Sequence, residues 1–209
     1  MSYIPQPMSE EIRDKFDQIL CLACERDNFD MINFLLTDND IKNCLAKKNH
    51  ALKIASYHGK VRLMQLLIDH GADIHYQDDE CLVLACARGQ IDTLKYFKES
   101  GYVHIELREE MLFVACENGH LEIVQYLLGK CKLSVNINHA RKLASKNNHS
   151  DIVRYLIGYG ADVCDDGNDA LKWAKYYEDQ KLIKYLLDEG ADKEIMKEDY
   201  WNFGNGWVC

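Results

Sequence analysis

Six short clusters of apolar residues recur along the 209-residue chain at nearly constant intervals, and each contains an alanine at the same place. When each repeat is numbered from that alanine, leucine stands at position −3 in five repeats and Arg141 in the other. Position −1 is always apolar as well, so each cluster is typical of a short helix with one apolar stripe. The six alanines, 32, 30, 30, 29 and 30 residues apart, are Ala23, Ala55, Ala85, Ala115, Ala144 and Ala174.

The residues that follow each cluster predict a turn and a second helix. Position +4 is glycine, asparagine or an acidic residue, and glycine and asparagine accept the left-handed backbone that ends a helix. Apolar residues at +8, +9 and +12, such as Leu63, Met64 and Leu67, again share one helical face. Position +16 is glycine in four repeats, which suits the end of the second helix.

Neither helix of a repeat is long enough to be stable alone in water. Stacking the repeats side by side covers their apolar stripes with one continuous core, so the pattern favours an all-α repeat array. The recurring alanine marks the place where helices approach closely. Position +1 is also small in most repeats, which indicates packing for its members Cys24, Ser56, Cys86, Cys116 and Ser145.

Charge narrows the classes of partner. The chain carries 25 basic and 34 acidic residues, a net charge of −9, and such a field repels phosphate backbones and anionic membrane surfaces. The longest apolar run, residues 81–87, is far shorter than the roughly 20 residues that span a bilayer. The N-terminus has no basic region followed by an apolar core, so we expect no secretory signal, no binding of nucleic acid or membrane, and a cytoplasmic location.

The sequence contains few residue patterns that could form a catalytic, redox or metal site. Nine cysteines, an odd number, argue against a disulfide framework. Cys21 and Cys24 form a C-x-x-C motif, but no second pair follows at zinc-site spacing, so we expect both to be buried. His149 and Asp151 are explained as the start of a second helix. Since phosphate-binding loops and catalytic motifs are also missing, we expect no catalytic, cofactor or metal site and a chain that is not an enzyme.

Residues 115–128 (ACENGHLEIVQYLL) and 67–73 (LIDHGAD) resemble ankyrin repeats, as do residues 151–162 and 186–192. The resemblance covers roughly residues 12–195 and implies an ankyrin-type α-solenoid of about six helix-turn-helix repeats. The repeats are shorter than the 33 residues of the family and lack its Thr-Pro-Leu-His string, so we expect shortened hairpin fingers. Short, proline-poor repeats of this kind are similar to the ankyrin proteins of giant viruses that infect amoebae.

The expected organisation has three parts. Residues 1–8 form a flexible tail, and residues 196–209 form an aromatic segment that either caps the last repeat or is offered to a partner. Ser9, followed by Glu10 and Glu11, predicts an N-cap for a helix in an N-terminal capping repeat. The array occupies residues 9–195, with repeats near 12–44, 45–76, 77–106, 107–136, 137–165 and 166–195.

The resemblance also implies a non-enzymatic module that binds a protein partner on a concave face built from the first helices and the finger tips. We expect a monomer, in a host-cell cytoplasm if the protein is viral. Val83 and Phe113 form a candidate apolar patch flanked by Tyr57 and Arg88, since aromatic residues and arginine dominate interface hot spots. The candidate contact residues are Tyr57, His58, Tyr76, Asp78, Val83, Arg88, Arg108, Phe113, Asn118, Lys146, Tyr176 and Tyr177.

Two alternatives remain open at this point. A structural subunit would self-associate, for example through the aromatic C-terminal segment. A thiol redox or metal protein would use Cys21 and Cys24 and would need at least one thiol of lowered pKa.

Overall fold

The computed structural model describes residues 9–38, 47–100, 109–130 and 135–197. Within these residues the chain forms twelve α-helices and a short 3-10 helix, Lys193–Lys197, and no strand. The prediction of an all-α fold is therefore confirmed. The chain divides into two compact units, Met1–Glu106 and Leu107–Cys209.

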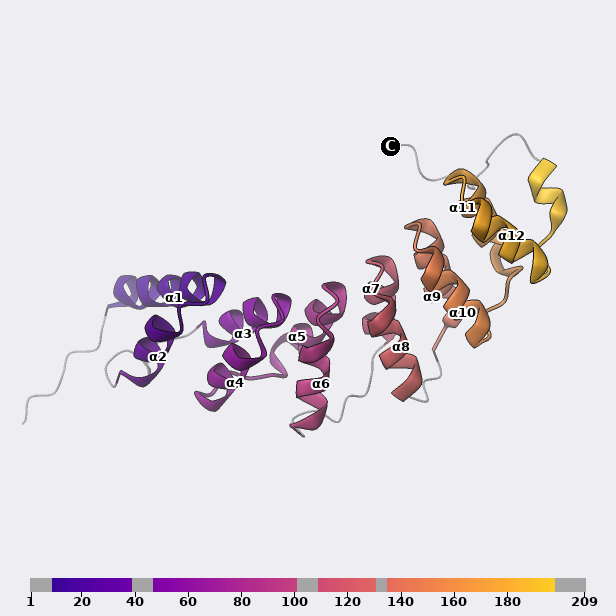
Figure 1. Cartoon of the computed structure of the whole chain (residues 1–209). Helices are drawn as coiled ribbons and strands as arrows, with labels where there is room; N and C mark the ends of the chain where they lie inside the picture. The colour runs from indigo at the N-terminus through magenta and orange to yellow at the C-terminus, as the bar shows by residue number, and fades with distance from the viewer. Residues whose placement is uncertain (1–8, 39–46, 101–108, 131–134, 198–209) are drawn as a thin grey trace, which may run out of the picture. The chain divides into compact units, whose positions relative to one another are not determined.

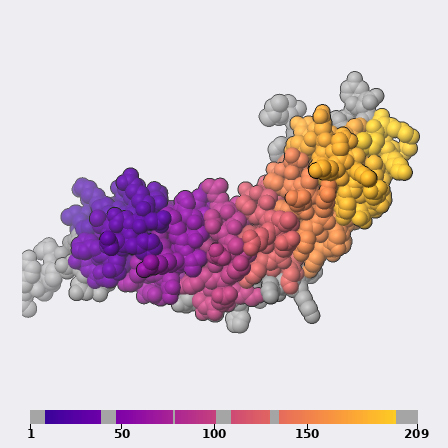
Figure 2. All heavy atoms as spheres, viewed as in Figure 1, coloured from indigo at the N-terminus to yellow at the C-terminus, as the bar shows by residue number. Residues whose placement is uncertain are grey.

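Unit 1 contains three helix pairs that follow one another in the order of the sequence (Figure 1). Within each pair the two helices pack together, and the first helices pack in a row, with α3 lying between α1 and α5. The space-filling view shows the consecutive pairs of this unit as successive bands of colour (Figure 2). The helices are α1 (Glu10–Glu25), α2 (Phe29–Thr37), α3 (Lys48–Tyr57), α4 (Val61–Asp69), α5 (Tyr76–Ala87) and α6 (Ile91–Glu99).

Unit 2 repeats the arrangement, with α9 packed between α7 and α11 and the 3-10 helix packed on α11. The first turn of α11 is irregular, because Asp166, Gly167 and Asn168 have positive φ angles of 52°, 65° and 62°. The helices are α7 (Glu109–Glu117), α8 (Leu121–Lys130), α9 (Ile137–Lys146), α10 (Ser150–Tyr159), α11 (Asp165–Tyr176) and α12 (Gln180–Asp188).

The turn inside each repeat has the left-handed residue that the sequence predicts. All six residues at position +4 have a positive φ, including Asp27 at 55° and Glu178 at 57°. Among the residues at position +16, Gly71, Gly160 and Gly190 also have positive φ angles, whereas the other three lie outside the described residues. The turn therefore keeps its shape even where an acidic residue replaces glycine.

The alanine positions lie where neighbouring helices meet. Five of the six alanines are at most 1% exposed, and Ala23 is 6% exposed. The position −3 side chains are buried too, and this holds for Arg141 as well as for the leucines. A larger side chain at the alanine position would push the first helices apart, because protein interiors leave little spare volume.

A second framework position, −6, contributes hydrogen bonds between consecutive repeats. In unit 1 the Oδ1 atom of Asn49 accepts a bond of 2.8 Å from the backbone N–H of Asp73. In unit 2 Asn138 accepts the same bond from Asp162 at 2.8 Å, and Asn168 accepts it from Asp192 at 2.9 Å. These bonds fix the connector that leaves each second helix.

The N-terminal end differs from the prediction at the helix cap. Ser9 precedes α1, but its side chain makes no capping hydrogen bond, since its backbone carbonyl alone accepts from Ile12 and Arg13. The first helix pair also leaves large apolar side chains exposed, among them Leu22 at 48% and Phe34 at 54%. The expected flexible tail and most of the aromatic segment lie outside the described residues.

Candidate functional site

The C-terminal ends of the first helices are tied to the following repeat through a main-chain acceptor. In unit 1 the Nζ atom of Lys60 donates to the carbonyl oxygen of Glu25 at 2.9 Å. The Nε2 atom of Gln90 donates to the carbonyl oxygen of Tyr57 at 3.5 Å. Both acceptors stand at position +2 of their repeat. Carbonyls at a helix C-terminus lack partners inside the helix, so these bonds satisfy them and also set how far apart the repeats lie.

Unit 2 uses the same acceptor position with different donors. His149 donates from Nε2 to the carbonyl oxygen of Glu117 at 3.0 Å. The hydroxyl of Tyr177 donates to the carbonyl oxygen of Lys146 at 2.7 Å. His149 therefore joins two consecutive repeats of unit 2. Because Asp179 is a carboxylate at the equivalent position, Tyr177 supplies the donor in the last repeat.

In unit 1 the exposed end of the first helices carries an aromatic and cationic group. The guanidinium of exposed Arg88 lies 4.0 Å from the ring centroid of half-buried Tyr57, in cation–π contact. His58 is exposed and meets the Tyr57 ring edge-on, with centroids 5.0 Å apart. The structure thus brings together Tyr57, His58 and Arg88, which the sequence singled out separately. Tyr76, at the start of α5, is 39% exposed.

The predicted apolar patch is not assembled within one unit. Val83 lies half-buried in unit 1, whereas Phe113 lies half-buried in unit 2 and packs edge-on against His139, with ring centroids 4.7 Å apart. The patch therefore stays a prediction. Two further candidates cannot be placed, since Arg108 and the side chain of Asp78 lie outside the described residues.

In unit 2 three aromatic rings gather at the end of α11. Trp173 stacks on Tyr177, with centroids 6.0 Å apart and planes 25° apart, and meets Tyr176 edge-on at 5.7 Å. Tyr176 is 58% exposed and Tyr177 is 37% exposed. Lys146 is exposed on α9, beside the hydroxyl of Tyr177. Asn118 is exposed on α7 and turns its amide back to the carbonyl oxygen of Val114 at 2.8 Å.

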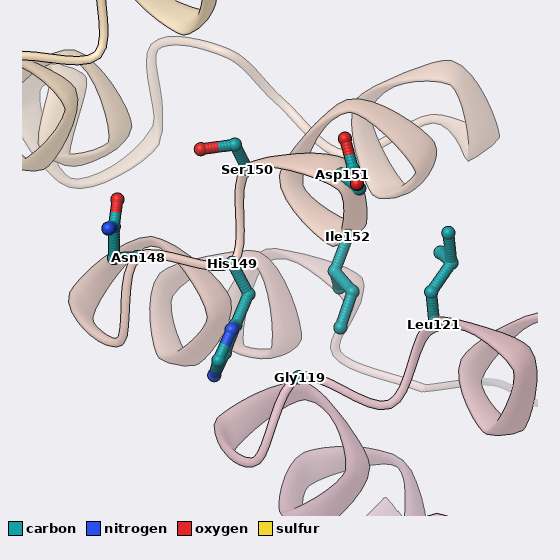
Figure 3. A pocket seen from close by; sticks show the side chains of 7 residues that line it. All are labelled: Gly119, Leu121, Asn148, His149, Ser150, Asp151 and Ile152. Carbon is teal, nitrogen blue, oxygen red and sulfur yellow. The ribbon is translucent and has the colours of Figure 1, made fainter.

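A pocket of about 260 Å³ lies between the α7–α8 turn and the start of α10 (Figure 3). The ring of His149 points towards Gly119, so closely that a Cβ atom at Gly119 would lie 2.5 Å from Cε1 of the ring. The side chain of Asp151 points in a different direction, so the two do not form an imidazole–carboxylate pair (Figure 3). The lining residues belong to the repeat framework, and we assign the pocket no chemistry of its own.

Cys24 is buried as expected and Cys21 is only half-buried, and neither thiol has the environment that a reactive cysteine needs. Burial raises the pKa of Cys24 to about 12, and burial together with the charge of Asp17 raises the pKa of Cys21. Burial also raises the pKa of Cys86 and of Cys116 to about 12. A redox or metal-binding thiol is favoured by a lowered pKa, so these shifts count against the redox and metal alternative. Among the described residues, no group of three or more metal-ligating side chains comes together.

Arg141 occupies a leucine position inside unit 2 and is 0% exposed. Its Nη2 atom donates to the carbonyl oxygen of Asp165 at 3.4 Å and lies 3.9 Å from the carboxylate of the same residue. Its Nε and Nη1 atoms have no hydrogen-bond partner among the described residues. Nearby, burial raises the pKa of Asp169, although the charge of Arg141 opposes the shift. The contacts with Asp165 therefore offset only part of the free-energy cost of burying the guanidinium charge.

The sequence did not lead us to two features that join the repeats: the side-chain acceptors at position −6 and the main-chain acceptor at position +2. The signal for the first was present, because position −6 is Asp, Asn or Glu in all six repeats, which is unusual on a helix that packs on both sides. The second left no signal, since the +2 acceptor is a main-chain atom and its donors Lys60, Gln90, His149 and Tyr177 differ in type and, for Tyr177, in position.

No helix of the described residues is both long and apolar enough to cross a membrane. Comparison with known protein families gives a match to "Ankyrin repeats (3 copies)" over residues 7–78, 77–141 and 112–197. The crystal structure of the human ASB11 ankyrin repeat domain shares the fold, with a TM-score of 0.65, 24% sequence identity and coverage of 83% of this chain and 84% of that one.

Two curated relatives are ankyrin repeat proteins. The chain is 32% identical to YahD of Escherichia coli (strain K12) over 126 residues, which are 56% of this chain and 63% of YahD. It is 28% identical to L675 of Acanthamoeba polyphaga mimivirus over 116 residues, which are 54% of this chain and 23% of L675. The chain thus matches less than two thirds of either relative. The family match covers most of the sequence and agrees with the six helix pairs, so the chain belongs to the ankyrin repeat family.

Proposed function

We propose that the chain binds a protein partner through the exposed face of its first helices. Ankyrin repeats are in general protein–protein interaction modules. One observation carries the assignment of this face. Positions 0 and +1 keep small, buried side chains in most repeats, whereas +2 and +3 change type from repeat to repeat. Nine of the twelve side chains at +2 and +3 are exposed, and the other three are half-buried.

The side chains at these positions have the chemistry of a recognition surface. Tyr57 with Arg88 in unit 1, and Tyr176 with Tyr177 in unit 2, combine flat rings with polar groups. Tyrosine and arginine are enriched among interface residues whose removal is costly, because each buries a large area and also forms hydrogen bonds. The +2 carbonyl bonds hold the helix ends in place, so the rings are oriented before a partner arrives.

The proposal extends to a cytoplasmic location and, if the chain is viral, to a host protein as partner. The similarity to mimivirus L675 supports this extension. Expression of a fluorescently tagged chain in amoebae, followed by fractionation, would test the location. Recovery of the chain mainly with membranes or nuclei would contradict it.

The binding proposal is tested by affinity capture with the full chain, identification of the captured protein by mass spectrometry, and titration of that purified protein. Tyr57→Ala and Tyr176→Ala, made separately, are each expected to weaken binding by about tenfold, the cost typical of an interface hot spot. Gln65→Ala on α4 and Gln125→Ala on α8 serve as matched controls, since both glutamines are exposed on second helices.

If the two glutamine variants weaken binding and the tyrosine variants do not, the binding site lies on the second helices. Circular dichroism spectra must match across all four variants, so that loss of binding is not loss of fold. If none of the four variants changes the affinity for the partner, the result contradicts the proposed surface.

A further inference from the structure

Asn118 stands directly before Gly119 in the turn between α7 and α8, and its side chain is exposed. An asparagine followed by glycine can lose its side-chain amide when the backbone nitrogen of the glycine attacks the side-chain carbonyl carbon. Glycine hinders this attack least, because it has no Cβ atom. Among the described residues, no other asparagine precedes a glycine. In that part of the chain, the reaction therefore meets the least steric hindrance at this turn.

The backbone N–H of Gly119 differs from the N–H groups at position +4 of the other five repeats. Those groups donate to the carbonyl oxygen at position +1, as Gly59 does to Ser56 at 3.2 Å. Asn148 donates to Ser145 in the same way, also at 3.2 Å. Gly119 makes no such bond within the part of the chain that the structure describes. Its nitrogen can therefore attack without first breaking a hydrogen bond inside the turn.

The surroundings of the turn require glycine and admit water. The ring of His149 packs so closely on Gly119 that a Cβ atom there would lie 2.6 Å from Nδ1 (Figure 3). The same ring donates to the carbonyl oxygen of Glu117, so a larger residue than glycine would disturb the bond between the two repeats. Gly119 also lines the pocket of about 260 Å³ and is half-buried rather than buried, so water reaches the turn.

Asn147, which is half-buried, provides a matched comparison in the next repeat of unit 2. Both asparagines stand at position +3, and each side-chain amide donates one helical turn back. Asn118 donates to the carbonyl oxygen of Val114 at 2.8 Å. Asn147 donates to that of Leu143 at 2.9 Å. One such bond contributes about 1 kcal/mol, so it delays the reaction of either side chain by a similar, small factor. The residue after Asn147 is Asn148, which has a Cβ atom and a bonded N–H.

We propose that the folded turn at Asn118 and Gly119 is a self-modification site, at which the chain loses the side-chain amide of Asn118. The nitrogen of Gly119 bonds to Cγ of Asn118 as the Cγ–Nδ2 bond breaks. Nδ2 leaves as ammonia, which carries the proton that the Gly119 nitrogen gives up. Water then opens the resulting succinimide ring at one of its two carbonyl carbons and yields aspartate or isoaspartate.

Either product weakens the junction between two repeats. A new carboxylate arises at the C-terminal end of α7, beside exposed Glu117, where the negative end of the helix dipole disfavours it. The carbonyl oxygen of Val114 loses its side-chain donor. Isoaspartate also adds a methylene group to the backbone of the turn on which the His149 ring packs. The contact between the α7–α8 pair and the α9–α10 pair is therefore expected to loosen.

The test follows the native full chain during incubation in mildly alkaline buffer. Peptide mass spectrometry locates the gain of one dalton, and an isoaspartyl methyltransferase labels the isoaspartate product. Asn118 is expected to react at least about tenfold faster than Asn147, a difference of about 1.4 kcal/mol in activation free energy. It is also expected to react within about tenfold of the rate in a synthetic peptide of residues 112–124, which is too short to form a stable helix.

Two variants separate the turn from the dipeptide. Asn148→Gly creates a second asparagine–glycine pair at a φ of 62°, which glycine accepts, with an N–H bonded to Ser145. Asn147 in this variant is expected to react about fivefold more slowly than Asn118, the factor for one bond of about 1 kcal/mol. Asn118→Gln is the unreactive comparison, because its longer side chain would have to close a six-membered ring. Its free energy of unfolding is expected to stay constant during incubation, whereas that of the original chain falls by about 1 kcal/mol.

Four results would overturn the inference. The first is a rate at Asn118 more than about tenfold below that of the peptide, which would mean that the fold protects it. The second is equal reaction of Asn118 and Asn147 in the original chain. The third is equal reaction of the two pairs in Asn148→Gly, since the reactivity would then belong to the dipeptide and not to this turn. The fourth is a deamidated chain as stable as Asn118→Gln. None of these measurements needs a binding partner, so their outcome is independent of the proposed function.

Discussion

At the scale of single residues, Arg141 departs furthest from the repeat pattern. Its guanidinium is fully buried, and its contact with Asp165 leaves the Nε and Nη1 atoms without partners among the described residues. Taking a charge out of water costs several kcal/mol, and one long hydrogen bond offsets only part of that cost. The other five repeats place leucine here and bury it without this penalty.

Arg141→Leu is therefore expected to raise the free energy of unfolding by about 1 kcal/mol, because the apolar residue that the other five repeats bury here replaces an incompletely paired charge. Urea denaturation followed by circular dichroism measures the change. Arg141→Ala is the comparison, expected to lower stability by leaving a cavity. A loss of stability in the leucine variant would show that the bonds to Asp165 outweigh the cost of burial.

The cysteines lead to a second prediction at this scale. Cys24, Cys86 and Cys116 are buried and their pKa values are raised to about 12, so almost no thiolate is present at pH 8. In contrast, Cys164 is exposed. Brief treatment of the native chain with iodoacetamide, followed by peptide mass spectrometry, is expected to label Cys164 and to leave the three buried thiols unmodified. Rapid labelling of Cys24 without unfolding would revive the redox alternative.

At the scale of the elements, consecutive repeats are joined by side chains that donate to a main-chain acceptor. The carbonyl at position +2 accepts from a lysine, a glutamine, a histidine or a tyrosine of the next repeat. A second set of bonds runs from backbone N–H groups of the connectors to the side chains at position −6. The spacing of the helix pairs is thus set at both ends of the first helices α3 and α9.

His149 offers a direct test, because Gln90 forms the equivalent bond in unit 1. His149→Ala is expected to lower the free energy of unfolding by about 1 kcal/mol, the usual net value of a hydrogen bond. His149→Gln is expected to recover most of that loss, since glutamine carries an N–H donor. Thermal unfolding of the three chains provides the comparison. Equal destabilisation by alanine and glutamine would mean that the imidazole acts through its packing on Gly119 instead.

At the scale of the whole molecule, apolar exposure is concentrated at the start of the chain. Five of the nine large hydrophobic residues found exposed belong to the first helix pair, although the described part of the chain contains six pairs. These five are Ile12, Ile19, Leu22, Met31 and Phe34. In an array, each pair relies on its neighbours to cover its apolar stripes, and among the described residues the first pair packs on the second through α1 and α3.

Replacing Ile19 and Phe34 together by glutamine is expected to change the free energy of unfolding by no more than about 1 kcal/mol, as is usual for exposed positions. The variant is also expected to bind less of the hydrophobic dye ANS. The adjacent buried residues provide the control, since Leu20→Gln with Leu35→Gln should cost more than about 4 kcal/mol. A large loss of stability in the first variant would mean that the exposed face supports the fold.

The sequence was sufficient to predict the helix pairs, the left-handed turns and the buried alanines, because each of these follows from spacing along a single repeat. It could not show that Phe113 packs on His139, or that Tyr177 bonds to the carbonyl of Lys146, since both depend on how one repeat meets the next. Ser9 had the right residue type for an N-cap, but the side chain does not make the bond. Contacts between repeats were therefore the part that sequence spacing left undetermined.

The use of a main-chain acceptor at position +2 has a consequence for how such arrays evolve. An oxygen of the backbone survives every substitution of its own residue, so a repeat can mutate freely there without a compensating change in its neighbour. When whole repeats are duplicated or recombined, each new junction between repeats therefore already has the acceptor of this hydrogen bond and needs only a donor. Lineages of this protein should accordingly gain, lose and shuffle repeats more readily than they alter the length of any one of them.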